Sequence, residues 1–476
     1  MPTCGPLLAG GTPPAGPATR HGNMVPVTAT ATTGPLPGDV LELTVGEAVN
    51  GGWCVARPDD KGGRVVFVRH ALPGERVRAV LTQITAKLAR ADAVEILVPS
   101  ADRVQPPCPH ARPGGCGGCD WQHASLPAQR RLKAAVIRQQ LARIGGLDRE
   151  VTVEPLDGDG DGDGEGGGGR PGSAPGLGWR TRVAFAIGPD GTPGLRRHRS
   201  HEITEVGECP IAYPAVNATG VTGSRWPGAT SVQVAAVPAT GERAVLVTGP
   251  LRGPVPPVAA DSLRSVGRGG ARTAVAGRGY LTQHAAGRDW RVDLAGFWQV
   301  HPAAADALAE AVGQALAPQA GDGAIDLYCG AGLFTGALAR AVGPSGTVIG
   351  VESDTTAVRD ARHNLREWPW ARVHRGDAGQ VLGRIGLSGA SVAVLDPPRA
   401  GADRAVIDAL AGAPASLRAI AYVSCDPATL ARDLRLLVAG GWALDGLRAF
   451  DAFPMTHHVE CLATLSRPQA PGSSSG

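Results

Sequence analysis

Hydrophobic and polar residues alternate along two stretches of this chain, and each stretch predicts short β-strands. Residues 37–98 contain four or five alternating runs, such as "DVLELTVGEAV", between Gly, Pro and Asp turns. Strands of this number and length predict a small barrel of the OB type. Residues 177–290 alternate in the same way, with a hairpin signal at "GPDGTPG", and predict a second β-rich region.

The pattern changes at about residue 291. Four apolar runs, "GAIDLYCG", "GTVIGVE", "SVAVLDPP" and "RAIAYVSC", are each followed by a helical stretch rich in Ala, Leu and Arg. Strands that alternate with helices predict a parallel, doubly wound sheet. The expected fold class is therefore α/β, with a Rossmann-like domain over residues 291–467.

The other segments are distinguished by composition. Residues 1–36 and 468–476 are rich in Pro, Gly, Ala, Thr and Ser, and we expect two disordered tails. Residues 156–176, "LDGDGDGDGEGGGGRPGSAPG", predict a flexible acidic insertion. A cysteine-bearing loop and a basic helix precede that insertion, so residues 99–290 are expected to form a central domain.

Net charge and targeting signals narrow the class of protein. The formal charge of +3 is too small to identify a partner, but residues 128–146 and "LRRHRSH" (195–201) are locally basic. Either cluster can meet phosphates or form an ordinary solvated surface. The chain shows neither an apolar run long enough for a membrane span nor a signal peptide, so we expect a cytoplasmic protein. Its nine cysteines then indicate metal binding or catalysis rather than disulfides.

The run "AIDLYCGAGLFTGALA" reads as a strand, a glycine turn and a helix. Gly330 and Gly332 let the backbone approach a ligand, and Glu352 ends the next strand, where a carboxylate commonly holds ribose hydroxyls. Thr335 stands where a dinucleotide fingerprint requires glycine. The turn therefore favours S-adenosylmethionine (SAM) over a nicotinamide cofactor, and a glycine turn in some other α/β enzyme is the alternative.

Asp396 ends a later strand in "VLDPPRAG". Methylases of exocyclic amines carry an aromatic residue after the two prolines, and Arg399 stands there instead. This substitution argues against amino methylation. A plain turn cap is the alternative reading of Asp396.

Cys425 lies between a predicted buried strand and a predicted helix that begins at Asp426-Pro427. A helix start lowers the pKa of a thiol, whereas burial raises it, so the position fits both a nucleophile and an inert core thiol. Glu460 precedes the last predicted strand and is a candidate general base or a surface carboxylate.

Three further cysteines are spaced C-x7-C-x2-C in "CPHARPGGCGGCDWQH", and "GECPI" supplies a fourth. Cys108, Cys116, Cys119 and Cys209 together could hold zinc or a 4Fe–4S cluster. The spacing alone does not separate these two groups, and unrelated thiols in a glycine-rich loop are the alternative.

Taken in order, these motifs resemble the RNA uracil-5-methyltransferase family, in the branch with a TRAM domain and an iron–sulfur cluster. The resemblance covers residues 37 to about 466. It is carried by "FVRHALPGERV", "CGGCDWQH", "ECPI", "FWQV", "DLYCGAGLFT", "GVE", "DPPRAG", "YVSCDPATLARDL" and "FPMTHHVE".

The resemblance implies a role for each site residue. Cys425 is similar to the nucleophile and Glu460 to the base that removes the C5 proton. The positions that contact SAM are Gln299, Tyr328, Glu352, Asp377 and Asp396. The four cysteines match the cluster ligands, which favours 4Fe–4S over zinc. His301, Leu333 and Asp426 depart from the residues usual in the family.

The expected function is SAM-dependent formation of 5-methyluridine in RNA, with 23S ribosomal RNA favoured over transfer RNA and a monomer expected. Two other classes remain as alternatives. A radical-SAM methylthiotransferase can also carry a TRAM domain, but it usually shows C-x3-C-x2-C and lacks this Rossmann series. A non-catalytic RNA-binding protein would not need both Cys425 and Glu460.

Overall fold

A computed structural model describes residues 36–57, 64–156, 174–267, 270 and 272–467. The two predicted tails and most of the predicted acidic insertion lie outside the described residues. The described residues from 37 onward form one compact unit by their contacts, so the predicted domain limits at 98 and 290 stay predictions. No helix in the described part of the chain is both long and apolar enough to cross a membrane.

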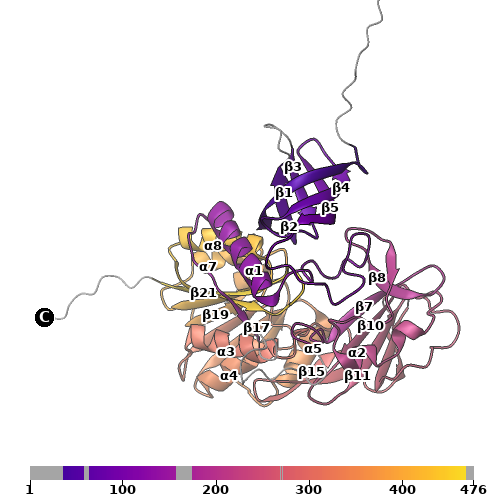
Figure 1. The fold of residues 1–476 in the computed structure, drawn as a ribbon. Coiled ribbons are helices and arrows are strands. Elements are labelled where there is room, and N and C mark those ends of the chain that lie inside the picture. Colours follow the sequence, from indigo (N-terminus) through magenta and orange to yellow (C-terminus); the bar gives the residue numbers. More distant parts are fainter. Residues whose placement is uncertain (1–35, 58–63, 157–173, 268–269, 271, 468–476) are drawn as a thin grey trace, which may run out of the picture. The chain divides into compact units, whose positions relative to one another are not determined.

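The first described region is a closed barrel of five strands, in the order β1-β2-β3-β5-β4 (Figure 1). Alternate side chains face its interior, as the sequence pattern requires, and Leu43, Val45 and Val77 are almost fully buried there. The predicted OB-type barrel is confirmed. Its strands are β1 (Val40–Val49), β2 (Trp53–Arg57), β3 (Val65–Arg69), β4 (Arg76–Ile84) and β5 (Leu88–Val98).

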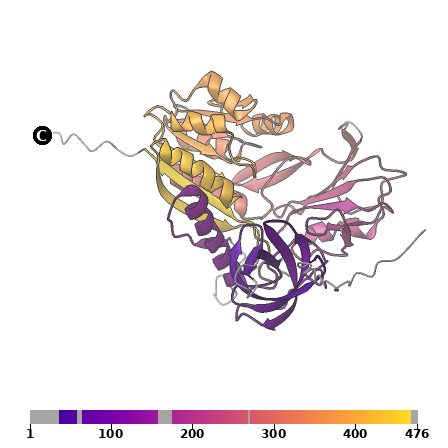
Figure 2. The same ribbon diagram turned by 90° about the horizontal axis from the view of Figure 1, so that it is seen from above.

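The cysteine-bearing loop follows the barrel and leads into helix α1 (Leu126–Gln140), which continues as η1 (Leu141–Gly145). Helix α1 and η1 pack against α8 (Pro427–Ala439), and both views show α1 beside that helix (Figures 1 and 2). The basic residues of α1 do not all face solvent. Lys133 is fully buried and pairs with Asp451, so part of this basic cluster serves packing.

The second β-rich region is a seven-stranded sheet in the order β13-β12-β11-β10-β7-β8-β9, accompanied by a separate hairpin of β14 and β15. Its elements are β7 (Arg182–Ile187), β8 (Pro193–Arg196), β9 (Ile203–Glu205), α2 (Pro214–Asn217), η2 (Val221–Gly223), β10 (Ser231–Ala236), β11 (Arg243–Thr248), β12 (Ser262–Val266), β13 (Arg272–Ala276), β14 (Tyr280–Ala285) and β15 (Arg288–Asp293). The basic segment 195–201 covers the end of β8 and most of the connection to β9, where Arg197 pairs with Glu202 on the surface.

The C-terminal region is built on an eight-stranded sheet in the order β18-β17-β16-β19-β20-β22-β21-β6. Strands β16 to β20 run parallel, and β22 is antiparallel to β20. The strands are β16 (Gly323–Leu327), β17 (Thr347–Glu352), β18 (Ala371–Arg375), β19 (Val392–Leu395), β20 (Ala419–Ser424), β21 (Ala443–Asp451) and β22 (Glu460–Ser466). The helices are α3 (Ala304–Leu316), α4 (Leu333–Val342), α5 (Thr355–Asn364), α6 (Ala378–Ile385) and α7 (Arg404–Ala411), together with α8.

The central strands of this sheet are apolar throughout because helices cover both faces. Every residue of β16 and β19 is buried. The predicted parallel, doubly wound sheet is therefore confirmed. The pattern did not predict β6 (Val153–Pro155), a short strand that precedes the acidic insertion and pairs with β21 at the edge of this sheet.

Candidate active site

The predicted site residues gather at one edge of the eight-stranded sheet. Parallel strands bind ligands beyond their carboxyl ends, above all where the strand order reverses, and here that point lies between β16 and β19. Strand β22 runs the other way, so its first residue lies at the same edge. The predicted residues at this edge are Tyr328, Glu352, Asp377, Asp396, Cys425 and Glu460.

Cys425 lies at the wall of a cavity of about 210 Å³. The start of α8 supplies one side, and His457 and His458 supply another. Asn50 and Gly51 also line the cavity and come from the turn between β1 and β2 of the barrel. The barrel, the sheet edge and the segment before β22 therefore meet at this thiol.

Burial decides the charge state of the Cys425 thiol in the free protein. It raises the pKa of Cys425 to about 12, and the carboxyl groups of Glu460 and Asp396 act in the same direction. Arg399 lowers the pKa but does not offset these effects. The helix start alone would favour a lower pKa, so the thiol is protonated at neutral pH because desolvation outweighs that effect.

Asp426 follows the thiol and caps α8. Its Oδ1 accepts hydrogen bonds from the backbone N–H groups of Ala428 and Thr429, both at 2.9 Å. The carboxylate is thus directed to the helix start. Although Asp426 differs from the residue usual in the family, it is a good N-cap for α8.

Three ionisable groups, Glu460, Asp396 and Arg399, influence one another beside Cys425. Burial and the Asp396 carboxyl raise the pKa of Glu460 well above its usual range, while Arg399 lowers it. Burial raises the pKa of Asp396 to about 7. Two carboxyl groups whose pKa values are both raised by burial are suited to proton transfer.

Glu352 holds the glycine turn after β16 to the end of β17. Its Oε2 accepts from the Gly330 N–H at 3.0 Å, and its Oε1 accepts from the Asp354 N–H at 2.7 Å. Gly332 begins α4 with a φ of +94°, a conformation that a side chain would strain. Tyr328 enters the same turn with a φ of +66°. Together they form an open backbone loop at the carboxyl edge.

Asp326, at the buried end of β16, provides a test of whether a cationic cofactor fits. Its Oδ2 accepts from Thr335 Oγ1 at 2.6 Å, whereas Oδ1 is buried without a hydrogen-bond partner. Burial raises the pKa of Asp326 to about 7, and the carboxylates of Asp396 and Glu352 raise it in part. A ligand that carries a sulfonium and an ammonium group suits this negative edge.

Gln299, Asp377 and the remaining departures each have a local structural setting. Gln299 is 9% exposed in the segment before α3. Asp377 is exposed and caps α6 by accepting from the Gln380 N–H at 2.9 Å. His301 Nδ1 accepts from the Ala303 N–H at 3.2 Å, so this histidine supports the turn into α3. Leu333 packs into the core as the first residue of α4.

The four clustered cysteines line one small cavity. Cys108, Cys116, Cys119 and Cys209 share its wall with Arg180, whose positive charge lowers the pKa of Cys116 and Cys209 against the effect of burial. Among the described residues, no three His, Cys, Asp or Glu side chains converge closely enough to hold one metal ion. The structure thus brings the predicted thiols together without defining a metal site.

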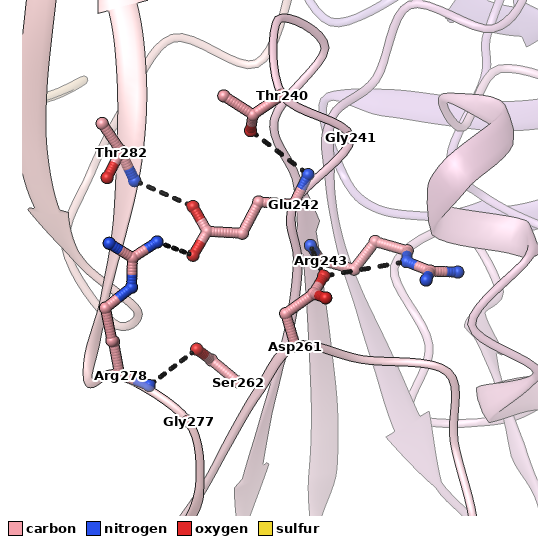
Figure 3. Close-up of a pocket in the computed structure, with 9 residues that line it drawn as sticks. All are labelled: Thr240, Gly241, Glu242, Arg243, Asp261, Ser262, Gly277, Arg278 and Thr282. Carbon is pink, nitrogen blue, oxygen red and sulfur yellow. Dashed lines mark hydrogen bonds and ion pairs between the residues drawn. The ribbon is translucent and has the colours of Figure 1, made fainter.

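A third cavity, of about 460 Å³, lies between the seven-stranded sheet and the β14–β15 hairpin (Figure 3). Glu242 accepts from Arg278 Nη2 at 2.8 Å and from the Thr282 N–H at 3.2 Å. Arg243 and Asp261 face each other on its other wall. Because the charged side chains drawn in Figure 3 pair with one another, we interpret this cavity as a structural contact between the sheet and the hairpin.

Sequence reasoning missed the neighbours that surround Cys425. Arg399 entered only as the residue that replaces an aromatic side chain, yet it lines the cavity and its Nη2 lies 3.4 Å from His458 Nε2. Burial lowers the pKa of His458 to about 3, so this ring is neutral and can accept from Arg399. Asp120 and Asn50 carried no signal of their own, although Asp120 lies inside "CGGCDWQH".

Comparison with known proteins agrees with this arrangement. Residues 385–468 match the family described as tRNA (Uracil-5-)-methyltransferase, and residues 36–94 match the TRAM domain. An uncharacterized RNA methyltransferase of Streptomyces avermitilis is 48% identical over 446 residues, covering 91% of this chain and 100% of the relative. One from Streptomyces coelicolor is 48% identical over 448 residues, covering 92% and 94%. This chain belongs to the RNA uracil-5-methyltransferase family.

The fold of this methyltransferase is shared with a solved structure. The Pyrococcus abyssi tRNA (uracil-54, C5)-methyltransferase in complex with S-adenosyl-L-homocysteine is 21% identical, with a TM-score of 0.64, covering 89% of this chain and 100% of that one. The two chains therefore share a fold, and this RNA methyltransferase has a TRAM domain as its barrel. The match over residues 385–468 includes Asp396, Cys425 and Glu460.

Proposed function

We propose that this methyltransferase forms 5-methyluridine in RNA, with Cys425 as the nucleophile and Glu460 as the base. The observation that carries the proposal is that Cys425 lies at the wall of a cavity and that the carboxyl groups of Glu460 and Asp396 lie close enough to raise the pKa of its thiol. A soft nucleophile and a base are what substitution at C5 of uracil requires, because C5 alone is a poor nucleophile.

The proposed reaction uses Cys425 first and Glu460 last. The Cys425 sulfur adds to C6 of uracil while its proton leaves to the Asp396 carboxylate, so that Glu460 stays available as a base. The addition makes C5 nucleophilic. SAM, when bound, would supply the methyl group that C5 takes and would leave as S-adenosyl-L-homocysteine. Glu460 then removes the C5 proton, the C5–C6 double bond reforms, and the thiolate is expelled. Because stacking shields both carbons in paired RNA, the target uridine must be flipped out or lie in a loop.

We assign SAM binding to Gln299, Tyr328, Glu352, Asp377 and Asp396. Support comes from the open turn after β16 and from the negative charge that surrounds the unpartnered Asp326 oxygen. In this assignment Glu352 and Asp377 would hold polar groups of the nucleoside. Calorimetry of SAM binding to Glu352→Gln tests the assignment, which predicts a weaker affinity. If the glycine turn has no role in SAM binding, the affinity should stay unchanged.

We also propose a 4Fe–4S cluster on Cys108, Cys116, Cys119 and Cys209. The support is that four thiols line one cavity and that thiolates are the donors such clusters prefer. A cluster there would tie the loop after the barrel to the β9–α2 connection. Iron and acid-labile sulfide analysis of anaerobically purified protein tests this, and zinc without iron would contradict it.

Ribosomal RNA is the proposed substrate because the combination of TRAM domain and cluster resembles that branch of the family. Transfer RNA is the second candidate, favoured by one observation. The Pyrococcus abyssi enzyme, whose whole chain aligns with this one, is named for transfer RNA. Mapping 5-methyluridine in both RNAs, with and without the gene, separates the two candidates.

The mechanism is tested with RNA that carries 5-fluorouridine at the mapped site. Fluorine at C5 cannot be removed as a proton, so wild-type protein should stop as a covalent protein–RNA adduct. Cys425→Ala should form no adduct and no 5-methyluridine while it keeps SAM affinity. Cys461→Ala is the matched control, because Cys461 is a fully buried thiol on the neighbouring strand. Turnover by Cys425→Ala would overturn the assignment.

A further inference from the structure

Asp120 joins three parts of the chain through one carboxylate. It directly follows Cys119 and is 7% exposed. Its Oδ2 lies 2.6 Å from His457 Nδ1 and accepts from the His457 N–H at 3.2 Å. Its Oδ1 lies 3.6 Å from Arg69 Nη2, at the end of β3 in the barrel. Both side chains of this ion pair are nearly inaccessible to solvent.

The backbone beside Asp120 is fixed to the same segment. The N–H groups of Asp120 and Trp121 both donate to the Met455 carbonyl, each at 3.0 Å. Gln129 of α1 accepts from the Met455 N–H at 2.7 Å. Met455 has a φ of +68°, unusual for a residue with a side chain, so these contacts hold a turn that the chain would not adopt readily.

The segment that begins at Met455 continues into His457, His458 and Glu460, which lie close to Cys425. The rings of His457 and His458 lie 4.0 Å apart between centroids, and His458 contacts Arg399. Both histidines line the cavity of Cys425, and Glu460 follows two residues later. A shift of His457 would therefore move the cavity wall and the approach of Glu460.

We propose that Asp120 is a positioning residue for methyl transfer, which fixes His457 and through it the cavity wall opposite Cys425. This inference rests on the proposed function. It also explains why the barrel reaches the cavity. A Cβ on Gly52 would fall 2.8 Å from Asp120 Cβ, so the β1–β2 turn packs directly on Asp120 and presents Asn50 and Gly51 to the cavity.

The test is Asp120→Asn, which keeps the size of the side chain but removes its charge and one of its two acceptors. Misplacing reacting groups by about 1 Å costs about 100-fold in rate, so we expect kcat for RNA methylation to fall by about 10- to 100-fold. The rate of adduct formation with 5-fluorouridine RNA should fall in parallel. SAM affinity and iron content should stay close to those of wild-type protein, whereas the melting temperature should fall because the buried Arg69 loses its partner charge.

Two further variants separate positioning from folding. Asp102→Asn removes an exposed carboxylate of the same loop, which pairs with Arg131, and should leave kcat unchanged. His457→Gln breaks the contact from the other side. If both residues act through that contact, Asp120→Asn combined with His457→Gln should lose no more activity than the worse single variant.

The outcomes divide clearly. Asp120→Asn turnover within twofold of wild type, or additive losses in the double variant, would overturn the positioning role. If Asp120→Asn lowers the melting temperature so far that its kcat cannot be interpreted, His457→Gln provides the test. An unchanged kcat of His457→Gln would overturn the positioning role as well. Wild-type protein that makes no 5-methyluridine and no adduct would instead contradict the proposed function.

Discussion

At the scale of single residues, burial raises the pKa of the Cys425 thiol most, and the charges around it act in opposite directions. Glu460 and Asp396 hold the proton on the thiol, whereas Arg399 favours the thiolate. Sequence motifs predicted Cys425, Glu460 and Asp396 because each stands at the end of a recognisable strand. They did not predict the raised pKa of Cys425, since burial depends on residues far away in the chain, such as Asn50.

Asp326 gives the fold a pH dependence that can be measured. Its pKa is raised from 3.8 to about 7, so the folded state binds more protons than the unfolded state between these values. Stability from this group is present at low pH and is lost as the pH rises through about 7. Asp326→Asn should therefore gain stability relative to wild type between pH 5.5 and pH 8, by about 2 kcal/mol.

Urea unfolding without SAM at the two pH values checks this expectation. The quantity to compare is the difference between variant and wild type at each pH, which removes any constant cost of the substitution. Asp403→Asn, in an exposed carboxylate before α7, is the control and should show no such trend. An equal effect of Asp326→Asn at both pH values would contradict the prediction.

At the scale of elements, the strands of the barrel and the parallel sheet could be predicted from periodicity, because burial on one or both faces marks the residues directly. The β6 strand could not, since three residues such as Val153–Pro155 form a strand only when β21 is beside them. The contact between the β1–β2 turn and Asp120 also left no local pattern.

That turn can be tested with two glycines of similar backbone conformation. Gly52 has a φ of +79° and packs on Asp120, whereas Gly74 has a φ of +84° and open space around it. Gly52→Ala and Gly74→Ala should each lose about 1–2 kcal/mol of unfolding free energy from strain. In methylation assays, we expect Gly52→Ala alone to lose at least about 10-fold in kcat, since only it displaces Asp120. Equal kcat values would show that the turn does not bear on the cavity.

At the scale of the whole molecule, distant segments are joined by buried charge. Lys133 of α1 pairs with Asp451 at the end of β21, both about 1% exposed, and also donates to the Phe453 carbonyl at 3.0 Å. Burial lowers the pKa of Lys133, while Asp451 raises it. Removing one partner leaves the other charge without compensation.

We expect Lys133→Met to lose about 3–5 kcal/mol of unfolding free energy, because Asp451 would remain buried and unpaired. Lys133→Met combined with Asp451→Asn should recover much of that loss. Arg131 lies on the same helix but is 61% exposed, so Arg131→Met should lose less than about 1 kcal/mol of unfolding free energy. Chemical denaturation of the four proteins provides the measurement, and a Lys133→Met protein as stable as Arg131→Met would refute this role for the pair.

The pairing of β6 with β21 also has a consequence during synthesis. Glu154 of β6 forms an ion pair with Arg448 of β21, and the two residues are 294 positions apart. At about 5–20 residues per second, the ribosome needs about 15 to 60 s to make the chain between them. Throughout that interval β6 has no strand to join and α1 has no α8 to pack against. The nascent chain therefore carries an unpaired β6 segment until the last strands emerge. A chaperone that covers this segment would prevent it from pairing with another chain during that time.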